Sequence, residues 1–556
     1  MKNLKSLCYS TNLWIYYVFC IFTVVGLSIF KPKSSYSTEN SENNIRTFTK
    51  INTTLPTSNW QPIEIACMSR SKINDIIYLN SKKDSIKIYS NSSDSNSFGV
   101  IYEARFEGKE IFNVLAYDFH KTGYNDLIIT YKEYETTSKP YLVGILENNK
   151  GELSKEIIQL NIQSLQVPFP LSGDDGTPKL MYVPQYAENA ELYYNDSFSI
   201  ATTLPKYKSL AIAKLNSNNY NFISLLGDDD SMFIQISDDH YDLLQKFEVP
   251  DYSTSITIAD FNSNGELDIL VTVSPKNDNP YFCIYFGTNG KFVGDKQCST
   301  IGSNIKIKPT IFNCQNCRIF DHISIADIDL DGRPDIIATT AYGTSVFLNQ
   351  FCRGCQGGEL FFTEFMTIPG KGGIYNDGLS GNYDIVTENG YFKGNLTNNE
   401  MFLIINSLDD VCLENCKGDK HPNPQPLTTI TYGATTNIVY TDKFGQRHKS
   451  IGVTRPTIDM QIPQLIFGFG EKLHYIQEVA ISSRNTKNLT WVLPNSLVYA
   501  TQKGQYKVMI GYKTNAYPVI CSCTALLLVL GFFVAYYTEK ENQEDRKEAA
   551  KMLPMF

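Results

Sequence analysis

A repeated acidic turn constrains this chain more than any other feature. The segments 256–272 and 323–339 match position by position: an apolar stretch, an acidic loop with a central glycine, and a second apolar stretch. A third copy covers 114–130. Short runs rich in β-branched residues predict strands, and Gly-centred acidic loops predict tight turns. Each copy is therefore expected to form a β-hairpin.

The spacing of the copies predicts the architecture. Weaker echoes at 74–78, 210–224 and 400–405 place the repeats roughly 45–70 residues apart, the length of one four-stranded propeller blade. About seven such blades fit between 60 and 410. An array of β-sandwiches is the alternative, although it would not need one loop motif in register. The predicted fold class is all-β, a seven-bladed β-propeller.

The acidic loops carry oxygen ligands at a spacing that suits calcium. Asp-x-Asn-x-Asn-Gly-x-x-Asp places side-chain oxygens at loop positions 1, 3, 5 and 9, and Ca²⁺ takes about six to eight oxygens. The first intact loop offers Asp260, Asn262, Asn264, Asp268 and the carbonyl of Glu266. The second offers Asp327, Asp329, Asp331, Asp335 and the carbonyl of Arg333. Two structural calcium sites are predicted, and the second should bind more tightly because it has four carboxylates.

The loops differ from an EF-hand, because no Glu stands at position 12 and β-type residues follow in place of a helix. A hydrogen-bonded, metal-free turn is the alternative. The third copy has His120 and Thr122 at positions 3 and 5, so a turn without calcium is expected there. Any ion would staple hairpins together, since the loops supply no general base beside a substrate pocket.

Two apolar segments flank the repeats. Lys2 and Lys5 precede an apolar stretch at 13–30, the layout of a cleaved secretory signal or a retained signal anchor. A second uncharged run, 518–537, would span ~30 Å as a helix and predicts a transmembrane segment, with a buried core helix as the alternative. The chain is therefore predicted to be a single-pass type I protein of the plasma membrane or secretory pathway.

Alternating β-type residues, with strands expected at 428–432 and 436–440, and a Pro-rich linker at 421–426 predict a small sandwich before this second segment. The predicted parts are a signal at 1–30, a variable lead-in at 31–59, the propeller at 60–420, the sandwich at 427–512, the transmembrane helix at 518–537 and a cytosolic tail at 538–556.

Sequons and cysteines agree with a lumenal or extracellular location. Asn-x-Ser/Thr glycosylation sites occur at Asn52, Asn91, Asn195, Asn395 and Asn488. Close spacing suggests disulfides between Cys283 and Cys298, Cys314 and Cys317, Cys352 and Cys355, and Cys412 and Cys416, with Cys67 left over. The two Cys-x-x-Cys pairs could instead ligate zinc or act in redox chemistry.

The repeat resembles the FG-GAP repeats of integrin α-subunit propellers, and the layout resembles the T-cell immunomodulatory protein (linkin) family. The C-terminal match is the more specific part: PQLIFGFG at 463–470, LTWVLPNSL at 489–497 and EDRKEA at 544–549. This resemblance implies a signal peptide, an FG-GAP propeller, a C2-like β-sandwich, one transmembrane helix and a short tail. The degenerate loop at 118–126 and the additional cysteine pairs depart from the family pattern.

The resemblance implies adhesion or modulation of other cells through protein ligands at the cell surface or in the secretory lumen. A net charge of −9 without a basic stripe argues against nucleic-acid binding. The six His residues and the absence of a nucleophile elbow argue against an enzyme. A trafficking or quality-control factor of the secretory pathway, and a propeller enzyme acting on glycans, are the alternatives.

Overall fold

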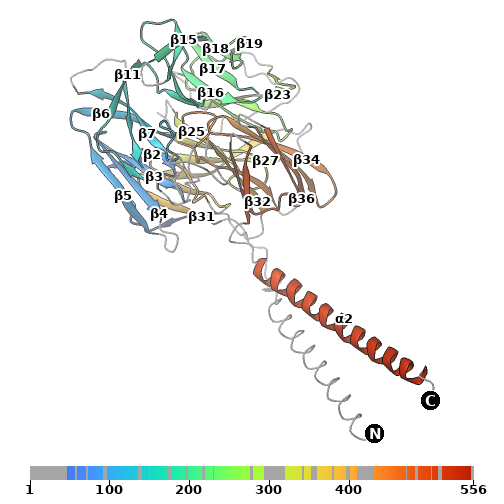
Figure 1. Cartoon of the computed structure of the whole chain (residues 1–556). Helices are drawn as coiled ribbons and strands as arrows, with labels where there is room; N and C mark the ends of the chain where they lie inside the picture. Colours follow the sequence, from blue (N-terminus) through green and yellow to red (C-terminus); the bar gives the residue numbers. More distant parts are fainter. Residues whose placement is uncertain are drawn as a thin grey trace. The chain divides into compact units, whose positions relative to one another are not determined.

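A computed structural model describes most of the chain between residues 47 and 552 (Figure 1). The described ranges are 47–56, 59–69, 73–91, 97–134, 141–149, 151–172, 177–194, 198–215, 219–228, 231–275, 280–292, 320–340, 343–351, 360–378, 381–395, 401–409, 430–470, 473–482, 486–501, 504–510 and 516–552. Residues 46–511 form one compact unit, and the terminal segments form another, which contains helix α2.

The compact unit begins with a series of antiparallel sheets that follow one another along the chain. The first sheet is β2 (Trp60–Ala66), β3 (Asp75–Asn80), β4 (Ser85–Asn91) and β5 (Phe98–Arg105). The second is β6 (Lys109–Tyr117), β7 (Asp126–Glu133), β8 (Tyr141–Leu146) and β11 (Ile158–Ser164), with the short pair β9 (Asn148–Asn149) and β10 (Glu152–Leu153) between the last two. The third is β12 (Phe169–Ser172), β13 (Pro178–Tyr182), β14 (Asn189–Tyr194) and β15 (Phe198–Pro205).

Four more sheets continue the series. The fourth is β16 (Ser209–Ala213), β17 (Asn221–Asp228), β18 (Ser231–Ser237) and β19 (Leu243–Val249). The fifth has three strands, β20 (Ser253–Ala259), β21 (Asp268–Val273) and β22 (Tyr281–Tyr285), followed by the pair β23 (Gly287–Thr288) and β24 (Lys291–Phe292). The sixth is β25 (Phe320–Ala326), β26 (Asp335–Thr340), β27 (Gly343–Phe351) and β28 (Leu360–Pro369), and the seventh contains β29 (Gly372–Tyr375), β30 (Asp384–Thr387) and β31 (Gly390–Asn395).

The seventh sheet is completed from the other end of the chain. Strand β1 (Thr47–Ile51) pairs antiparallel with β31, so the outermost strand of the last sheet precedes the first sheet in sequence. First strands of neighbouring sheets contact one another, as β2 does with β6 and also with β29. The first and the seventh sheets therefore lie side by side.

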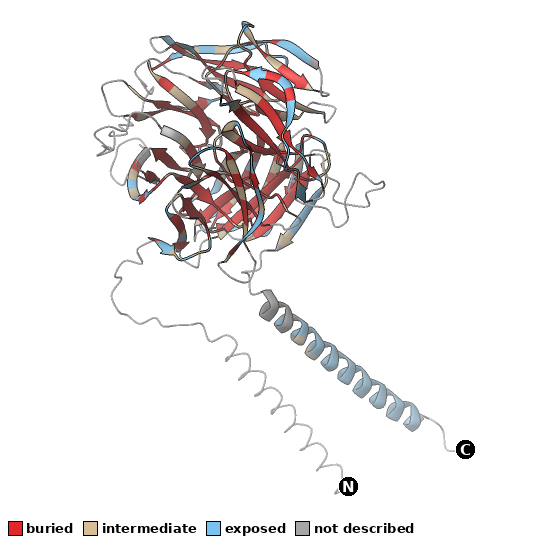
Figure 2. Ribbon diagram, turned by 90° about the vertical axis from the view of Figure 1, so that its left-hand side faces the viewer, coloured by how far each residue is buried: buried red, intermediate tan, exposed pale blue. Residues whose placement is uncertain are grey.

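The C-terminal part of the compact unit, β32–β39, is called the C-terminal module below. One sheet has the order β35 (Leu465–Gly470), β32 (Met401–Leu408), β38 (Ser496–Thr501), β39 (Tyr506–Ile510). The other has the order β34 (Arg447–Thr454), β33 (Ala434–Asp442), β36 (Leu473–Ser482), β37 (Thr486–Thr490). Both sheets contribute to one apolar core, in which Leu403 and Val498 meet Val479. Figure 2 shows that buried residues follow the strands throughout the compact unit.

Two local predictions differ from the structure. The stretch 400–405 was expected to be an exit strand of the repeats, but β32 pairs antiparallel with β35 and parallel with β38 of the C-terminal module. A strand predicted at 428–432 is absent from its described part, 430–432, because these residues pack as irregular chain against other sheets. The echo at 210–224 does form the hairpin of β16 and β17.

Helix α2 (Ala516–Met552) covers the apolar run that was predicted to cross a membrane. Within the residues that the structure describes, no helix has both the length and the apolar character that crossing a membrane requires. The helix itself confirms the predicted helical structure of 518–537, and its membrane crossing stays a prediction. Helical structure continues beyond the apolar run through the charged segment 539–551.

Candidate cation site in the acidic turns

The three predicted turns share one backbone conformation. Loop position 4 has a positive φ in each of them, 54° at Lys121, 55° at Ser263 and 53° at Leu330. Loop position 6 is Gly in all three, also with positive φ. Side chains strongly disfavour this left-handed region, which explains the glycine. The alignment made from sequence is therefore confirmed in three dimensions.

The two outer Asp residues of each turn bind its main chain. In turn 327–335, Asp327 accepts hydrogen bonds from the N–H groups of Asp331 (3.0 Å) and Gly332 (2.9 Å). Asp335 accepts the N–H of Ile328 at 2.7 Å and that of Asn349 at 2.8 Å. The second contact ties the turn to strand β27. The equivalent pairs, Asp118 with Asp126 and Asp260 with Asp268, make corresponding bonds.

Turn 327–335 gathers three buried carboxylates. Oxygens of Asp327, Asp329 and Asp335 lie within 4.8 Å of one another. Burial raises the pKa of Asp327 and Asp335 well above the usual range of an aspartate, and the neighbouring negative charges raise both further. A hard divalent cation takes such oxygens as ligands and would neutralise them. This donor set therefore fits calcium. Asp331, which was also predicted as a ligand, is not one of these three clustered residues.

Turn 260–268 is poorer in charge. Burial raises the pKa of Asp260 to about 7 and that of Asp268 well above its usual range. The amide oxygens at positions 3 and 5 are engaged by the turn itself: Asn262 accepts the N–H of Asn264 at 3.1 Å, and Asn264 accepts that of Glu266 at 2.7 Å. Its predicted binding of calcium, weaker than in turn 327–335, stays a prediction.

Turn 118–126 has basic side chains of its own. His120 places Nδ1 2.9 Å from Asp126 and Nε2 3.3 Å from Glu147. Lys121 Nζ lies 2.6 Å from Asp409, which is 1% exposed. The chain thus has His120 at position 3, where the other turns have Asn262 and Asp329, and Lys121 at position 4 brings a positive charge to this turn.

Two further turns use the same final aspartate, and the sequence comparison missed their role. Asp75 accepts the N–H of Met68 at 2.7 Å, and Asp384 accepts that of Gly394 at 2.8 Å. Both stand at the start of an exit strand, before Ile-Ile and Ile-Val, as Asp335 does before Ile-Ile. An aspartate that opens an exit strand was the available signal, even where the rest of the motif is lost.

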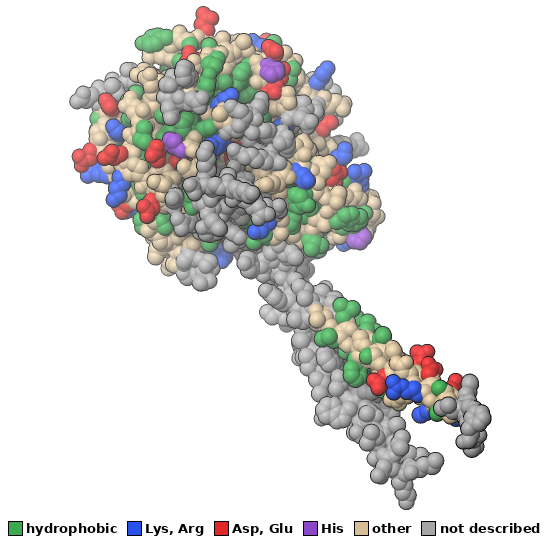
Figure 3. Space-filling view, viewed as in Figure 1, with side chains coloured by type: hydrophobic (Ala, Val, Ile, Leu, Met, Phe, Trp, Pro, Cys, Tyr) green, Lys and Arg blue, Asp and Glu red, His purple; other side chains and the backbone are tan. Residues whose placement is uncertain are grey.

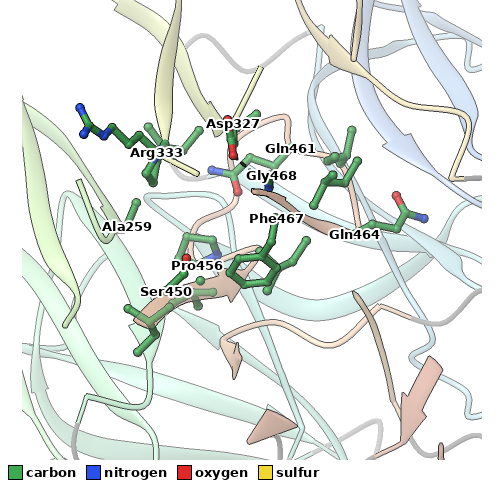
Figure 4. A pocket seen from close by; sticks show the side chains of 18 of the residues that line it. Ala259, Asp327, Arg333, Ser450, Pro456, Gln461, Gln464, Phe467 and Gly468 are labelled. Atoms are coloured by element: carbon green, nitrogen blue, oxygen red, sulfur yellow. Dashed lines mark hydrogen bonds between the residues drawn. The ribbon is translucent and has the colours of Figure 1, made fainter. Parts of the chain in front are cut away.

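The C-terminal module contacts the acidic turns. The N–H of Gly468 in β35 donates to Asp327 Oδ2 at 2.9 Å, and the N–H of Gly470 donates to the carbonyl of Leu330 at 2.8 Å. A Cβ on Gly468 would lie 2.3 Å from Leu330 Cα, so only glycine fits this approach. A cavity of about 80 Å³ opens beside this contact, lined by residues that include Asp327, Gln461 and Gly468 (Figure 4).

The other predicted sites are described only in part. Cys283 is disulfide-bonded, and Cys67 is buried with its sulfur 3.7 Å from the carbonyl of Ser69. Asn52 and Asn488 are exposed, and Asn91 is partly buried. Asn195 and the side chain of Asn395 lie outside the described residues. The same holds for the remaining predicted cysteines, which are Cys298, Cys314, Cys317, Cys352, Cys355, Cys412 and Cys416.

The sheets and turns together define an all-β protein of consecutive antiparallel sheets that are joined by acidic, Gly-centred turns. No protein-family model matches the chain. It is 22% identical over 619 residues to a T-cell immunomodulatory protein homolog of Plasmodium falciparum, covering 85% of this chain and 84% of that protein. A homolog of the same name from Plasmodium yoelii yoelii is 20% identical over 603 residues and covers 83% and 84%. This similarity, which spans most of both chains, supports the predicted resemblance to the T-cell immunomodulatory protein family.

Solved structures give only weak similarity. A rhamnogalacturonan lyase is 10% identical with a TM-score of 0.35, covering 63% of this chain and 76% of that one. An exo-β-1,3-galactanase from Phanerochaete chrysosporium is 10% identical with a TM-score of 0.27, covering 80% and 98%. At these scores neither the fold nor the function of this chain is inferred from them.

Proposed function

We propose that this protein is a non-enzymatic binding protein whose seven sheets form a closed, calcium-stapled β-propeller that presents a rigid surface to protein partners. The name of its relatives supports a role in modulating other cells. The observation that carries the calcium part is the cluster of Asp327, Asp329 and Asp335, three buried carboxylates within 4.8 Å. When bound, the ion would neutralise them and hold the hairpin of β25 and β26 to β27.

Propeller closure is supported by two contacts. Strand β2 lies against both β6 and β29, and β1 completes the sheet of β31 from the other end of the chain. A ring of seven blades accounts for both, because it brings the first and the last blades together. The three-stranded fifth sheet is then one blade whose described part lacks an outer strand.

The surface charge supports protein partners over nucleic acid. In Figure 3, lysine and arginine side chains are interspersed with aspartate and glutamate over the face in view. A nucleic-acid surface would instead gather basic side chains into a patch or stripe. Exposed Trp491 stacks on Tyr475 at 5.4 Å between ring centroids, and exposed aromatic pairs of this kind are common anchors at protein interfaces.

The location is proposed as the cell surface or the secretory lumen, since the sequons and the cysteines suit an oxidising compartment. Membrane attachment through 518–537 stays a prediction from the sequence. Intact cells labelled with a membrane-impermeant crosslinker test both the location and the role. We expect a surface-labelled chain captured together with a covalently linked protein, and more of it in calcium than in chelator.

Two results would decide against parts of this proposal. Labelling only after permeabilisation would replace the surface role by the secretory-pathway alternative. Surface labelling without any linked protein, in calcium as in chelator, would reject the binding role. Cells treated with crosslinker that was quenched beforehand are the control for nonspecific capture. A chain with Asp118→Asn is the control for an altered turn.

A further inference from the structure

Two irregular stretches of the C-terminal part, residues 430–433 and 455–464, are together called the plug below. They precede and follow the hairpin of β33 and β34. Both are described as non-strand chain, yet most of their residues are buried. Buried irregular chain must satisfy its polar groups, and the partners of the plug are the first strands of the seven sheets.

Arg455 is the largest fully buried side chain of the described residues, at 2% exposure. Its Nη2 lies 2.5 Å from Glu64 Oε1 in β2, and Glu64 is itself 1% exposed. The same nitrogen also donates to the carbonyls of Ile65 and Gln461. An arginine and a glutamate that are both buried need each other, because either one alone would be an uncompensated charge. Arg455 thereby fixes the plug to the first sheet.

Tyr432 reaches the second and third sheets. Its hydroxyl donates to the carbonyl of Ala116 in β6 at 3.4 Å. Its ring lies 5.6 Å, centroid to centroid, from Phe169 in β12, with an edge-to-face geometry. Aromatic pairs prefer this arrangement. Gly433 follows closely against Ile212 of β16, where a Cβ would lie 2.7 Å from that side chain.

Residues 455–464 reach the remaining sheets. The carbonyl of Pro456 accepts the N–H of Ile212 in β16 at 2.8 Å, and Pro456 lines one cavity with Ile258 of β20. The carbonyl of Met460 accepts the hydroxyl of Ser324 in β25 at 2.5 Å. The Met460 side chain packs against Gly373 of β29, where a Cβ would lie 3.0 Å from its sulfur.

From these contacts we infer that the plug fills the centre on which the first strands of all seven sheets converge. The sheets then close around a segment of the C-terminal module in place of a water-filled channel, and the two parts unfold as one cooperative unit. The centre is therefore not where a partner or substrate binds. This inference does not depend on calcium binding, and it directs the search for the partner surface to the outside of the molecule.

The chain carries natural probes for a test. Its three tryptophans are Trp14, Trp60 in the first sheet and Trp491 in the C-terminal module. In the full-length chain with Trp14→Phe, further replacement of Trp60 or Trp491 by Phe leaves one reporter in either part. We expect guanidinium unfolding followed by either fluorophore to give the same midpoint, as two-state unfolding requires. Two separate midpoints would overturn the inference.

Arg455→Met supplies the second arm. Loss of the partner leaves Glu64 buried and charged, so we expect the folding equilibrium constant to fall by roughly 100-fold or more, with both reporters shifting together. Arg447→Met, at an exposed arginine of β34, is the matched control and should leave both midpoints in place. If Arg455→Met does not fold, Met460→Ala replaces it. A variant that shifts only the Trp491 reporter would show that the plug belongs to the C-terminal module alone.

Discussion

Turns 118–126 and 327–335 share a backbone and differ in what surrounds their carboxylates. In both, the first aspartate binds the main chain of the turn, and the last one binds the main chain of a later strand. Around turn 118–126, Lys121 pairs with Asp409, and His120 lies between Asp126 and Glu147. The charges that act on Asp327 and Asp335 are those of other aspartates.

The difference teaches that the scaffold of the turn and its charge are separable. Positive φ at positions 4 and 6 and the two outer aspartates are enough to build the turn. The side chains at positions 3 to 5 then decide whether the chain supplies the positive charge or leaves a place for an external cation. The degenerate copy of the motif in this chain is therefore still a structural element.

The largest effect on stability that we expect comes from removing the positive charge of Lys121. Lys121→Met should lower the free energy of unfolding by about 3 kcal/mol, because Asp409 would stay buried without its charged partner. Urea unfolding measures this loss. Lys82→Met, at an exposed lysine, is the control. A loss no greater than that of the control would mean that the turn does not need Lys121, and the comparison would then rest on backbone alone.

The second largest effect that we expect is stabilisation by calcium, which should depend on turn 327–335 and not on turn 118–126. With free calcium at a hundred times its Kd, we expect the free energy of unfolding to rise by about 2.7 kcal/mol. Asp327→Asn should remove this gain, whereas Asp118→Asn, which alters the same position of the other turn, should keep it. The measurement is thermal unfolding in calcium and in chelator. Equal losses in both variants, or no gain in the parent protein, would contradict a site at turn 327–335.

The local part of this structure could be predicted from the sequence, and the long-range part could not. Three hairpins and their turns follow from short patterns of apolar and acidic residues, since the turn is stabilised by its own main chain. The convergence of Asp327, Asp329 and Asp335 follows from the same register.

The plug had no such pattern. Tyr432 was expected in a strand because it stands among threonines and isoleucine, but its ring packs between β6 and β12, more than 250 residues away in the chain. Arg455 likewise gives no local sign of its partner Glu64. Strand β32 belongs to the C-terminal module because it pairs in parallel with β38, which lies about 90 residues later in the chain. Such placements depend on which surfaces remain to be covered once the sheets have formed.

The contact between Gly468 of the C-terminal module and turn 327–335 also distinguishes this turn from turn 118–126. A Cβ on Gly468 would lie 2.4 Å from Asp327 Oδ2, so Gly468→Ala should destabilise the protein by about 2 kcal/mol and displace a predicted ligand. We therefore expect weaker calcium binding by titration calorimetry. Gly99→Ala, where a Cβ meets nothing within 4 Å, should change neither quantity. Unchanged calcium affinity in Gly468→Ala would separate the metal site from the docking of the module.

The smallest expected effect is the contribution of turn 118–126 to the pH dependence of stability. Burial, followed by the charge of Asp126, raises the pKa of Asp118 to about 7. The unfolded chain releases that proton near about pH 3.9, so between these values the folded state binds more protons than the unfolded one. The contribution of Asp118 is therefore favourable at low pH and is lost as the pH rises through this window.

In chelator, the urea midpoint of the parent protein should accordingly decrease from pH 5 to pH 7, and Asp118→Asn should flatten part of that decrease. Asp84 offers a matched control, because its hydrogen bond from Asn80 holds its pKa below the usual value and it titrates outside this range. Asp84→Asn should leave the slope unchanged. A slope that Asp118→Asn does not alter would place Asp118 as an ordinary ionised aspartate, already neutralised by Lys121. Turn 327–335, in which burial also raises the pKa of Asp327 and Asp335, would then respond to protons while turn 118–126 would not.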